Sequence, residues 1–546
     1  MNPATHTLPY LLGIDYGTES CRVAVFDAAG TPVSFAATSY PTSYPQSGWA
    51  EQDVDDWYRA LVSSAHEALS RAGIDPTLIA GIGFAATSAS VVSLDSDGMP
   101  LRPAIMWMDV RAAAHAARTT DVLDAMATPG RAANVPASAE LFPFKAAWLK
   151  EHEPETYRRT AYLLDAPDWL GYRLTGRLRT NENSAAAKMY HDRSVGGFPR
   201  DFYTAIGCLD ALDKLPVAVE PLGTLLGHLT KATAADLGLP AGIPVAEGCI
   251  DAYAGQIGLN VLAPGKMALI TGSSHVLLGQ APLEFADSGA TGAFADAVLP
   301  GQCSVEAAIV SSGSAIRWFR DTFARDLVQA ASAGGPSAYD VLNAEAAGIP
   351  EGSDGLIAVP YFQGCRAPEA DSKARAILWG LSLSHSRAHI YRALQEGICY
   401  AVADNLRRMH RKGYQVHELV ACGGALNSPT WMQMHADITG LPIALTKVQD
   451  AVALGACVMA ASAGGVYSSV EDAADAMVHR VRRIEPDLGS HERYQPFLDA
   501  YVDTYPRLVD LQHDMTDRAT NMRALAADSQ ANSNRTPDER GDRPGA

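Results

Sequence analysis

The chain has 546 residues, which is too long for one ordinary hydrophobic core and predicts two or three domains. Its composition, with 47% hydrophobic and 19% charged residues, is ordinary for a soluble globular enzyme. The formal net charge of −18 argues against a nucleic-acid or anionic-membrane partner, because such partners select for patches of lysine and arginine that the sequence lacks.

The eight cysteines are spread singly, without a C-x-x-C pair or a histidine cluster at metal-ligand spacing. This pattern excludes a recognisable zinc motif and predicts reduced thiols in a cytoplasmic protein. Residues 1–10 show no basic region followed by an apolar one, so no signal peptide is expected. The longest run of small apolar residues, Ala451 to Val466, is too short to span a bilayer and predicts a tightly packed core helix.

Two apolar runs near the start, Tyr10–Ile14 and Val23–Phe26, flank a short turn and predict a β-hairpin. Asp15 ends the first strand, where a carboxylate can hold a hard divalent cation such as Mg²⁺. Gly17 lets backbone N–H groups approach a phosphate, and Thr18 adds a hydroxyl group. An Asp-x-Gly turn is also common in hairpins that bind nothing, so a phosphate-binding turn and a purely structural turn both stay open at this point.

Later the chain repeats this device, with an apolar run at Met267–Ile270, a turn at Thr271–Ser274 and a second run at His275–Leu278. Two such hairpins can clamp a polyphosphate between two domains. This duplication is that of the actin-like ATPases and sugar kinases. The chain resembles the FGGY family of carbohydrate kinases, nearest to its ribulokinase-like branch, from about Leu11 to about Ala461.

The resemblance implies an α/β protein of two ribonuclease H-like domains with a ligand cleft between them. Residues 1–262 would form an N-terminal sugar-binding domain and residues 263–487 a C-terminal nucleotide-binding domain. Residues 488–546 would be a tail. The tail is amphipathic and predicted to be helical to about Met522, and it is predicted to be disordered from Ala526, where periodicity is lost.

The segment from Trp107 to Arg111 suits a sugar, because an indole face covers C–H groups while Asp109 and Arg111 bond hydroxyl groups. A buried tryptophan beside an Asp–Arg pair would give the same residues without any ligand. In the FGGY family the corresponding Trp-x-Asp-x-Arg segment contributes to the sugar pocket. By the same resemblance, Thr87 and Ser88 lie where the family contacts its substrate.

A buried strand from Val245 runs into Gly248, and Asp251 then opens a helix rich in alanine and glycine. An aspartate at a helix start is commonly just a cap. The family places its catalytic base at this Gly-x-x-Asp-Ala segment. The resemblance therefore implies that Asp251 takes the proton of the sugar hydroxyl, while Asp15 helps to hold Mg²⁺.

Two further loops fit a nucleotide. Ser311–Ser314 runs into a helix and offers N–H groups to a phosphate, although an ordinary cap looks the same. A later strand ends in the paired glycines at 423 and 424, which let a flat ring or a phosphate lie against the backbone. Relatives use this second loop for the adenosine half of ATP. The residues expected to bind the nucleotide are Gly17, Thr18, Thr271, Gly272, Ser273, Ser314, Gly423, Gly424 and Asn427.

Other motifs add local expectations. Gly81–Ala86 matches G-x-G-x-x-A, but it lies within a strand and is followed by another strand, so a dinucleotide site is excluded. Pro360–Arg375 closely resembles the family's Gly-x-Arg-x-Pro…Asp-x-x-Ala-Arg segment, and Thr180–Ser184 is expected to be a polar loop near the cleft. Predicted helices are Val54–Arg71 behind Asp53, Phe144–Glu151, Ala166–Leu174, a short one after Thr233, and Arg387–His410.

The predicted reaction is ATP- and Mg²⁺-dependent phosphorylation of a terminal hydroxyl group of a small sugar, foremost a ketopentose such as ribulose. The xylulose and glycerol branches carry Gln-Met-His or Arg-Glu on the strand that here reads Phe84–Ser88. The ribulose-like branch often has an aspartate where this chain has Ala85, so another pentulose, a tetrulose such as erythrulose, or a polyol stays open. Further alternatives are a sugar-independent actin-like ATPase and a non-catalytic sugar-binding protein. The sequence does not determine the oligomeric state, and a homodimer stays open.

Overall fold

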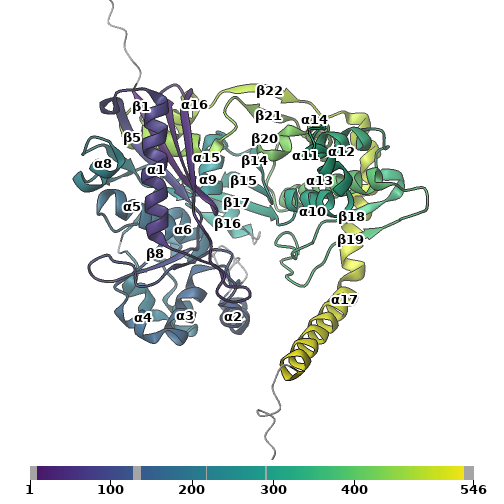
Figure 1. Ribbon diagram of the computed structural model, residues 1–546, viewed down its shortest axis with the longest axis horizontal. Helices are drawn as coiled ribbons and strands as arrows, with labels where there is room; N and C mark the ends of the chain where they lie inside the picture. The colour runs from purple at the N-terminus through teal and green to yellow at the C-terminus, as the bar shows by residue number, and fades with distance from the viewer. Residues whose placement is uncertain (1–8, 127–136, 217, 289–291, 534–546) are drawn as a thin grey trace, which may run out of the picture.

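The computed structural model describes residues 9–126, 137–216, 218–288 and 292–533. The chain forms two lobes, each built on a seven-stranded sheet, and a long C-terminal helix that projects from the second lobe (Figure 1). This is the two-part α/β architecture expected from the sequence, while the boundaries at residues 262 and 487 stay predictions. None of the helices in the described ranges is both long and apolar enough to cross a membrane.

The sheet of the first lobe has the strand order β11-β12-β5-β1-β2-β3, and β13 also pairs with β5. The predicted hairpin is present, and its turn is closed by a hydrogen bond from the Gly17 N–H to the Ser20 carbonyl oxygen, 3.0 Å long. β1 and β13 both pair in parallel with β5, so these three strands end at one edge of the sheet. The strands are β1 (Tyr10–Tyr16), β2 (Ser20–Asp27), β3 (Pro32–Ser39), β5 (Ile79–Ala86), β11 (Leu225–His228), β12 (Pro244–Ala246) and β13 (Cys249–Ile250).

Helix α1 (Val54–Ala72) packs on β2 and β3, with Asp53 as its N-cap and Gly73 ending it, as predicted. A small four-stranded sheet extends this lobe, in the order β4 (Glu51–Gln52), β7 (Ala104–Ile105), β6 (Val91–Leu94) and β8 (Tyr162–Asp165). The other elements of this lobe are α2 (Ala113–Met126), α3 (Phe142–His152), α4 (Pro154–Arg159), α5 (Ala166–Thr175), β9 (Thr180–Asn181), α6 (Glu182–Lys188), α7 (Arg200–Ala205), β10 (Val219–Glu220) and α8 (Lys231–Leu237).

The sheet of the second lobe has the order β16-β17-β15-β14-β20-β21-β22, and its first hairpin, β14 with β15, is the predicted repeat of the N-terminal one. Its strands are β14 (Lys266–Thr271), β15 (His275–Pro282), β16 (Ala293–Ala295), β17 (Gln302–Ile309), β20 (Glu418–Gly423), β21 (Ile443–Thr446) and β22 (Arg480–Ile484). A separate pair is β18 (Ile357–Val359) with β19 (Ile377–Trp379). The helices are α10 (Gly313–Phe323), α11 (Arg325–Ser332), α12 (Ala338–Ala347), α13 (Arg387–Arg411), α14 (Pro429–Thr439) and α16 (Val470–Met477).

Two helices join the lobes: α9 (Asp251–Gly258) and α15 (Ala451–Ala463) pack on each other, and α15 also packs on β1 and β5. Glycines allow the backbones of α9, α15 and β5 to come this close. A Cβ atom at Gly455 would lie 1.8 Å from the carbonyl oxygen of Ala254, and one at Gly83 would lie 1.9 Å from that of Ala456. The prediction of a tightly packed core helix in this region is confirmed, because α15 meets a helix and a sheet at backbone distance.

Three local predictions are wrong. Thr180–Ser184 is not a loop: it forms β9 and the first turn of α6 and is buried, because the Asn181 side chain accepts a hydrogen bond from the Ser184 N–H (2.7 Å) and caps the helix. The short helix expected after Thr233 is α8 (Lys231–Leu237), and its N-cap is Thr230, three residues before the predicted cap. The third correction concerns the tail.

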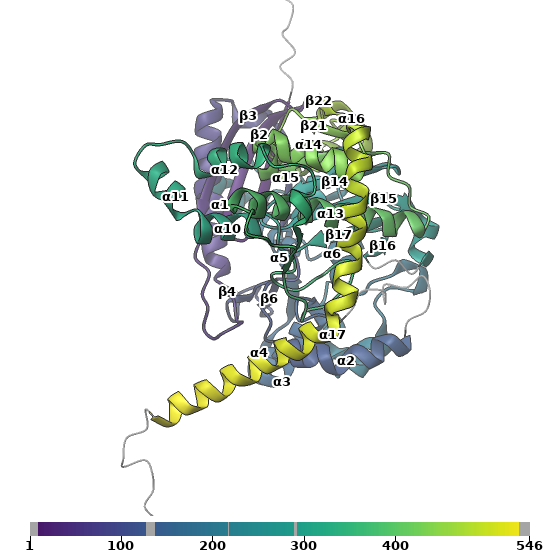
Figure 2. The same cartoon turned by 90° about the vertical axis from the view of Figure 1, so that its right-hand side faces the viewer.

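Helix α17 (Leu488–Ser533) is a single helix of 46 residues. Its first part packs on the second lobe through Tyr494, Leu498, Tyr501 and Tyr505, which are buried. Past them, Gln512, His513 and Asp517 still contact residues 371–375, and only the last part of the helix projects from the body (Figure 2). The disorder predicted from Ala526 is wrong as far as Ser533, where the alanine-rich sequence favours a helix; residues 534–546 lie outside the described part of the chain.

We expect Gly455→Ala to lower the midpoint of thermal unfolding, because the added Cβ meets the Ala254 carbonyl oxygen at 1.8 Å and overpacking of this kind costs about 1–3 kcal/mol or more. The matched control is Gly348→Ala, where the nearest atom to the new Cβ is the Glu345 carbonyl oxygen at 3.7 Å. Differential scanning calorimetry of both variants checks the expectation. An unchanged midpoint in the Gly455 variant would show that the two helices have room to separate.

Candidate active site

Asp15 lies at the end of β1, beside the turn of the first hairpin, and is 2% exposed. Its Oδ2 atom is 3.3 Å from the Arg22 guanidinium, whereas its Oδ1 atom is buried without a hydrogen-bond partner in the described structure. Burial raises the pKa of Asp15 to about 7, against the attraction of Arg22 and with the repulsion of Asp251 and Asp450. A buried carboxylate with an unpartnered oxygen has the donor chemistry that a hard divalent cation requires.

Arg22 connects two carboxylates that are far apart in the sequence. Besides Asp15, it contacts Asp450, with Nη1 3.3 Å from Oδ2. Asp450 is the N-cap of α15, and its Oδ1 accepts the Ala453 N–H at 3.2 Å. The sequence analysis missed both Arg22 and Asp450. The available signals were a charged residue inside an otherwise apolar strand and an acidic residue before a helix, and neither is specific.

Asp251 is the first residue of α9, directly after the short strand β13. Because Ile250 in β13 and Tyr16 in β1 both pair with Ala86 of β5, Asp251 and the hairpin turn come out at the same edge of the sheet. Burial raises the pKa of Asp251 to about 6, and the hydrogen bond from the Ala252 N–H (2.7 Å) and the charges of Arg22 and Lys188 oppose the rise. The structure therefore brings the expected base to the turn that carries Asp15.

Thr87 and Ser88 follow β5 at this edge and are both 7% exposed. The Thr87 N–H donates to the Tyr16 carbonyl oxygen at 3.0 Å, which extends the sheet by one residue. The Ser88 hydroxyl donates to Asp165 at 2.8 Å. These groups lie beside the predicted catalytic edge, but the Ser88 hydroxyl is used within the protein, so their contact with a substrate stays a prediction.

Asp109 and Arg111 form a buried ion pair with two hydrogen bonds, of 2.9 and 2.8 Å. The Arg111 guanidinium also lies 2.8 Å from Glu51 and 3.9 Å from the centre of the Trp49 ring. This is the arrangement that the sequence left open as the alternative to sugar binding. In the structure the pair fixes the segment that follows Trp107, and a direct contact of either side chain with a sugar stays a prediction.

The Trp107 indole N–H donates to the Thr18 hydroxyl at 3.1 Å, which joins an expected sugar residue to an expected nucleotide residue. Lys145 of α3, which is fully buried, holds the same segment from behind. Its ammonium group donates to the carbonyl oxygens of Ala89, Met106 and Trp107, at 2.8, 2.7 and 3.0 Å. Burial lowers the pKa of Lys145 to about 7. Lys145 is thus a positioning residue whose role the sequence did not show.

The expected nucleotide residues of the second lobe come together from three loops. Thr271 ends β14, and its hydroxyl donates to the Cys422 carbonyl oxygen (2.7 Å) and accepts the Ala425 N–H (3.1 Å). The N–H and the hydroxyl of Ser314 both donate to the Ser273 carbonyl oxygen at 3.0 Å. Gly272, Gly423, Gly424 and Asn427 are on the same loops, the last two in a 3₁₀ turn over Gly424–Asn427.

Glycine is required where these loops meet. Gly423 has a φ of +97°, and a Cβ atom there would lie 2.1 Å from the Thr271 carbonyl oxygen. A Cβ atom at Gly313 would lie 2.3 Å from the carbonyl oxygen of Gly272. The loops therefore meet at backbone distance, and their glycines leave the backbone uncovered by side chains, as a phosphate site requires.

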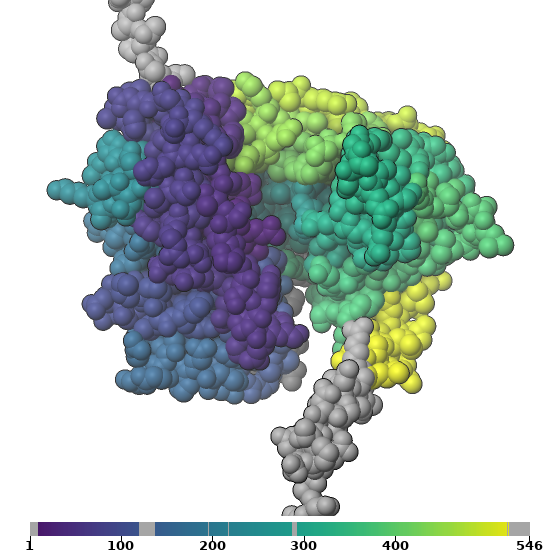
Figure 3. All heavy atoms as spheres, viewed as in Figure 1, coloured from purple at the N-terminus to yellow at the C-terminus, as the bar shows by residue number. Residues whose placement is uncertain are grey.

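A cavity of about 760 Å³ lies between the lobes and is lined by residues from both. Arg366 of the second lobe reaches Glu140 of the first across it, with a separation of 2.7 Å. The molecule is visibly hollowed between its purple N-terminal part and its green C-terminal part in Figure 3. The polar lining residues include Glu140, Lys188, Glu306, Gln363, Arg366 and Arg408.

Two of these lining residues connect the cavity with Asp251. The positive charge of Lys188 lowers the pKa values of both Asp251 and Glu306. Glu306 accepts a hydrogen bond from the Tyr253 hydroxyl at 2.8 Å, and Tyr253 lies two residues after Asp251 on α9. The sequence analysis missed Lys188 and Glu306, because single charged residues on separate elements give no local pattern.

Two family profiles match the chain: the N-terminal domain of the FGGY family of carbohydrate kinases over residues 10–258, and the C-terminal domain of that family over residues 267–464. The chain belongs to the FGGY family of carbohydrate kinases. It is an enzyme of the kinase class, as the sequence predicted. The structure supports the membership, because each lobe carries the predicted hairpin and residues of both lobes line the cavity between them.

The family's named relatives include kinases for different sugars. The chain is 28% identical over 510 residues to a xylulose kinase of Bacillus subtilis (strain 168), covering 92% of this chain and 98% of the relative. It is 30% identical over 499 residues to a ribulokinase of Anoxybacillus flavithermus, covering 85% and 88%. The crystal structure of a xylulose kinase from Rhodospirillum rubrum superposes with a TM-score of 0.82 at 28% identity, covering 92% of this chain and all of that one.

We expect Lys145→Met to lower the unfolding free energy by about 3 kcal/mol or more, because three buried carbonyl groups lose their donor and each costs about 1–3 kcal/mol when unpaired. Lys150→Met on the same helix is the control. Lys150 is partly exposed and pairs with Asp210, and surface pairs contribute about 0–1 kcal/mol. Chemical denaturation measures both, and equal stabilities would remove Lys145 from its positioning role.

Proposed function

We propose that this FGGY kinase transfers the γ-phosphoryl group of ATP to a terminal hydroxyl group of a ketopentose. The observation that carries the proposal is the position of Asp251. It lies at the same end of the sheet as Asp15, and the charge of Lys188, which lines the cavity between the lobes, acts on it. The cavity volume of about 760 Å³ is in the range of small-molecule sites and leaves room for a five-carbon sugar beside the phosphate end of a nucleotide.

Asp251 would act as the general base. With a pKa of about 6 it is ionised at neutral pH, yet basic enough to accept the proton of a hydroxyl group as that group attacks the phosphorus. The Ala252 N–H holds one carboxylate oxygen and leaves the other towards the substrate. Lys188 and Glu306 would bind sugar hydroxyl groups, because they line the cavity next to this base.

The nucleotide would lie against the loops of the second lobe, with its phosphates towards the turn that holds Gly17 and Thr18. The N–H groups of the 271–274 and 311–314 loops suit phosphate oxygens, and the exposed glycines 423 and 424 suit the adenosine half. Most of the catalysis would come from positioning and electrostatic stabilisation, as is general for phosphoryl transfer.

Mg²⁺ fits the residues of this site. The unpartnered Oδ1 of Asp15 is the first donor we assign to it, and Asp450 is a second carboxylate on the other side of Arg22. Bound Mg²⁺ would neutralise charge on the phosphates during transfer. Arg22 would be freed from the two carboxylates and could pair with phosphate oxygens. The cleft would then hold a positive charge both before and after Mg²⁺ binds.

The preferred sugar is proposed to be a ribulose. The segment Phe84–Ser88, at the end of β5 and just after it, resembles the ribulose-type branch more than the xylulose or glycerol ones, and the ribulokinase relative is 30% identical. The xylulose kinase relative matches a larger share of the chain at 28% identity, so xylulose is the main competitor. Ala85 is buried between β1 and β13 and offers no polar group to either sugar.

We expect Asp251→Asn to lower kcat by about 10²–10⁴-fold, the usual cost of losing a general base, while the affinity for Mg²⁺-ATP stays near the wild-type value. In the wild type at saturating Mg²⁺, which would keep Asp15 ionised, log(kcat/KM) should fall with a slope near one below about pH 6, because protonation of Asp251 removes the base. Steady-state kinetics and nucleotide titrations measure both effects. A variant that keeps more than a tenth of wild-type kcat would remove Asp251 from this role.

ADP release measured with D- and L-ribulose, the xyluloses, erythrulose, glycerol and ribitol should give the highest kcat/KM for a ribulose. A site that bonds one hydroxyl group rejects the epimer by leaving a buried group unpaired, so one inverted centre should give a clear preference. If xylulose or glycerol turned over more than about tenfold better than every ribulose, the substrate assignment would be wrong. ADP release that no sugar or polyol increases would favour a sugar-independent ATPase instead.

A further inference from the structure

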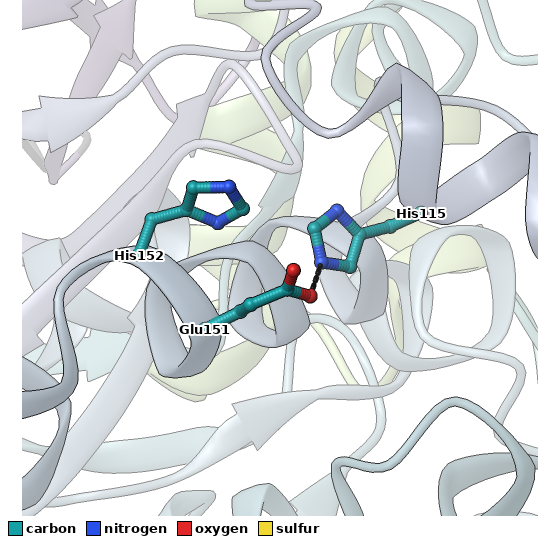
Figure 4. A group of neighbouring side chains, drawn as sticks. All are labelled: His115, Glu151 and His152. Carbon is teal, nitrogen blue, oxygen red and sulfur yellow. Dashed lines mark hydrogen bonds and ion pairs between the residues drawn. The ribbon is translucent and has the colours of Figure 1, made fainter.

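A second group of potential metal ligands lies where α2 meets α3, apart from the residues around Asp251 (Figure 4). His115 comes from the first turn of α2, and Glu151 and His152 come from the last turn of α3. One ligand atom from each side chain lies within 4.8 Å of the other two. In the described ranges of the chain, this is the one group of three His, Cys, Asp or Glu side chains that meets this spacing.

We propose that His115, Glu151 and His152 bind a Zn²⁺-type transition-metal ion, with its fourth position open to water. Two imidazoles and one carboxylate are a common zinc ligand set, and that set leaves one tetrahedral position free. Mg²⁺ prefers oxygen ligands, so this site and the carboxylates of the cleft should select different ions. No sequence motif predicted this metal site, because its three residues lie on two separate helices.

The three side chains already face one another. In Figure 4 the Glu151 carboxylate lies between the two imidazole rings. His115 Nε2 is 2.8 Å from Glu151 Oε2, and ligands on a tetrahedral zinc at 2.0–2.1 Å lie about 3.3 Å apart, so a metal ion can replace the proton between these two atoms with little movement of either. The ligand atom of His152, within 4.8 Å of both, would move closer. The Nδ1 atom of His115 is buried and has no hydrogen-bond partner in the described structure, so no second bond opposes adjustment of the ring.

His152 is prepared for the same role by the backbone. Its Nδ1 atom is 3.1 Å from the Trp148 carbonyl oxygen, and as the donor it leaves the lone pair of Nε2 free. A backbone carbonyl that orients an imidazole in this way is the usual second partner of a metal-bound histidine. The ring also stacks on the Trp148 indole, with centroids 4.8 Å apart and an interplanar angle of 3°, which limits its motion.

Arg118 is the one positive group at this site that the structure places on the carboxylate: its Nη2 atom is 3.3 Å from Glu151 Oε2. Its side chain is 62% exposed, so it can turn to solvent when a cation arrives. Arg118 therefore competes with the metal ion for Glu151. Removing its charge should tighten metal binding, which is a result that a merely structural ion pair would not produce.

The test uses full-length protein without an affinity tag, stripped with a chelator and titrated with Zn²⁺ by calorimetry in excess Mg²⁺, which occupies the cleft carboxylates. We expect one equivalent to bind, and Arg118→Gln to bind it more tightly. His115→Gln and His152→Gln should each weaken binding at least about tenfold. The control His66→Gln replaces a histidine of α1 whose Nε2 lies 2.8 Å from the Asp236 carbonyl oxygen, away from the proposed site, and it should leave binding unchanged.

Retention of the equivalent in both histidine variants, or no uptake by the wild type, would overturn the proposal. A second measurement covers variants that fail to fold: the visible spectrum of the Co²⁺-loaded wild type should show nitrogen and oxygen ligation. A thiolate charge-transfer band would instead assign the metal to one of the eight buried cysteines and would equally overturn the site.

Discussion

The close crossing of α9 and α15 is the constraint on which the rest of the structure depends. The two helices touch through backbone atoms at Gly258 and Gly455, where any side chain would collide with a carbonyl oxygen. Each helix also begins at a carboxylate of the proposed site, Asp251 on α9 and Asp450 at the cap of α15. The contact between the helices therefore sets the distance between the proposed base and the proposed metal site, and small residues far from the chemistry control its geometry.

Arg22 is the cation that acts on all three carboxylates at this crossing. Asp15, Asp251 and Asp450 all act on Arg22, whose positive charge lies among them. Burial favours the protonated forms of Asp15 and Asp251, and the charge of Arg22 favours the ionised forms. Their pKa values of about 7 and 6 lie above the usual range, so Arg22 offsets the effect of burial only in part. A divalent cation at the proposed metal site would favour the ionised form of both carboxylates.

The sequence predicted the elements whose signals are local. The hairpin at Asp15, the cap and end of α1, the repeated turn at Thr271 and the small-residue pattern of α15 are short-range features, and each was found where expected. Arg22 with Asp450, and Lys188 with Glu306, meet only through the fold, so no window of sequence contains the pair. Asp109 and Arg111 show a further limit, because a buried pair and a sugar-binding pair use the same residues.

Helix α15 covers β1 and β5, although it comes near the end of the chain while β1 is almost at its start. On the ribosome, the first hairpin therefore emerges long before the helix that shields it. One apolar face of the nascent sheet therefore stays exposed until most of the polypeptide has been synthesised. Exposed apolar surface of this kind is prone to aggregation. Chaperone dependence in the cell would then follow from the same helix crossing that places Asp251 and Asp450.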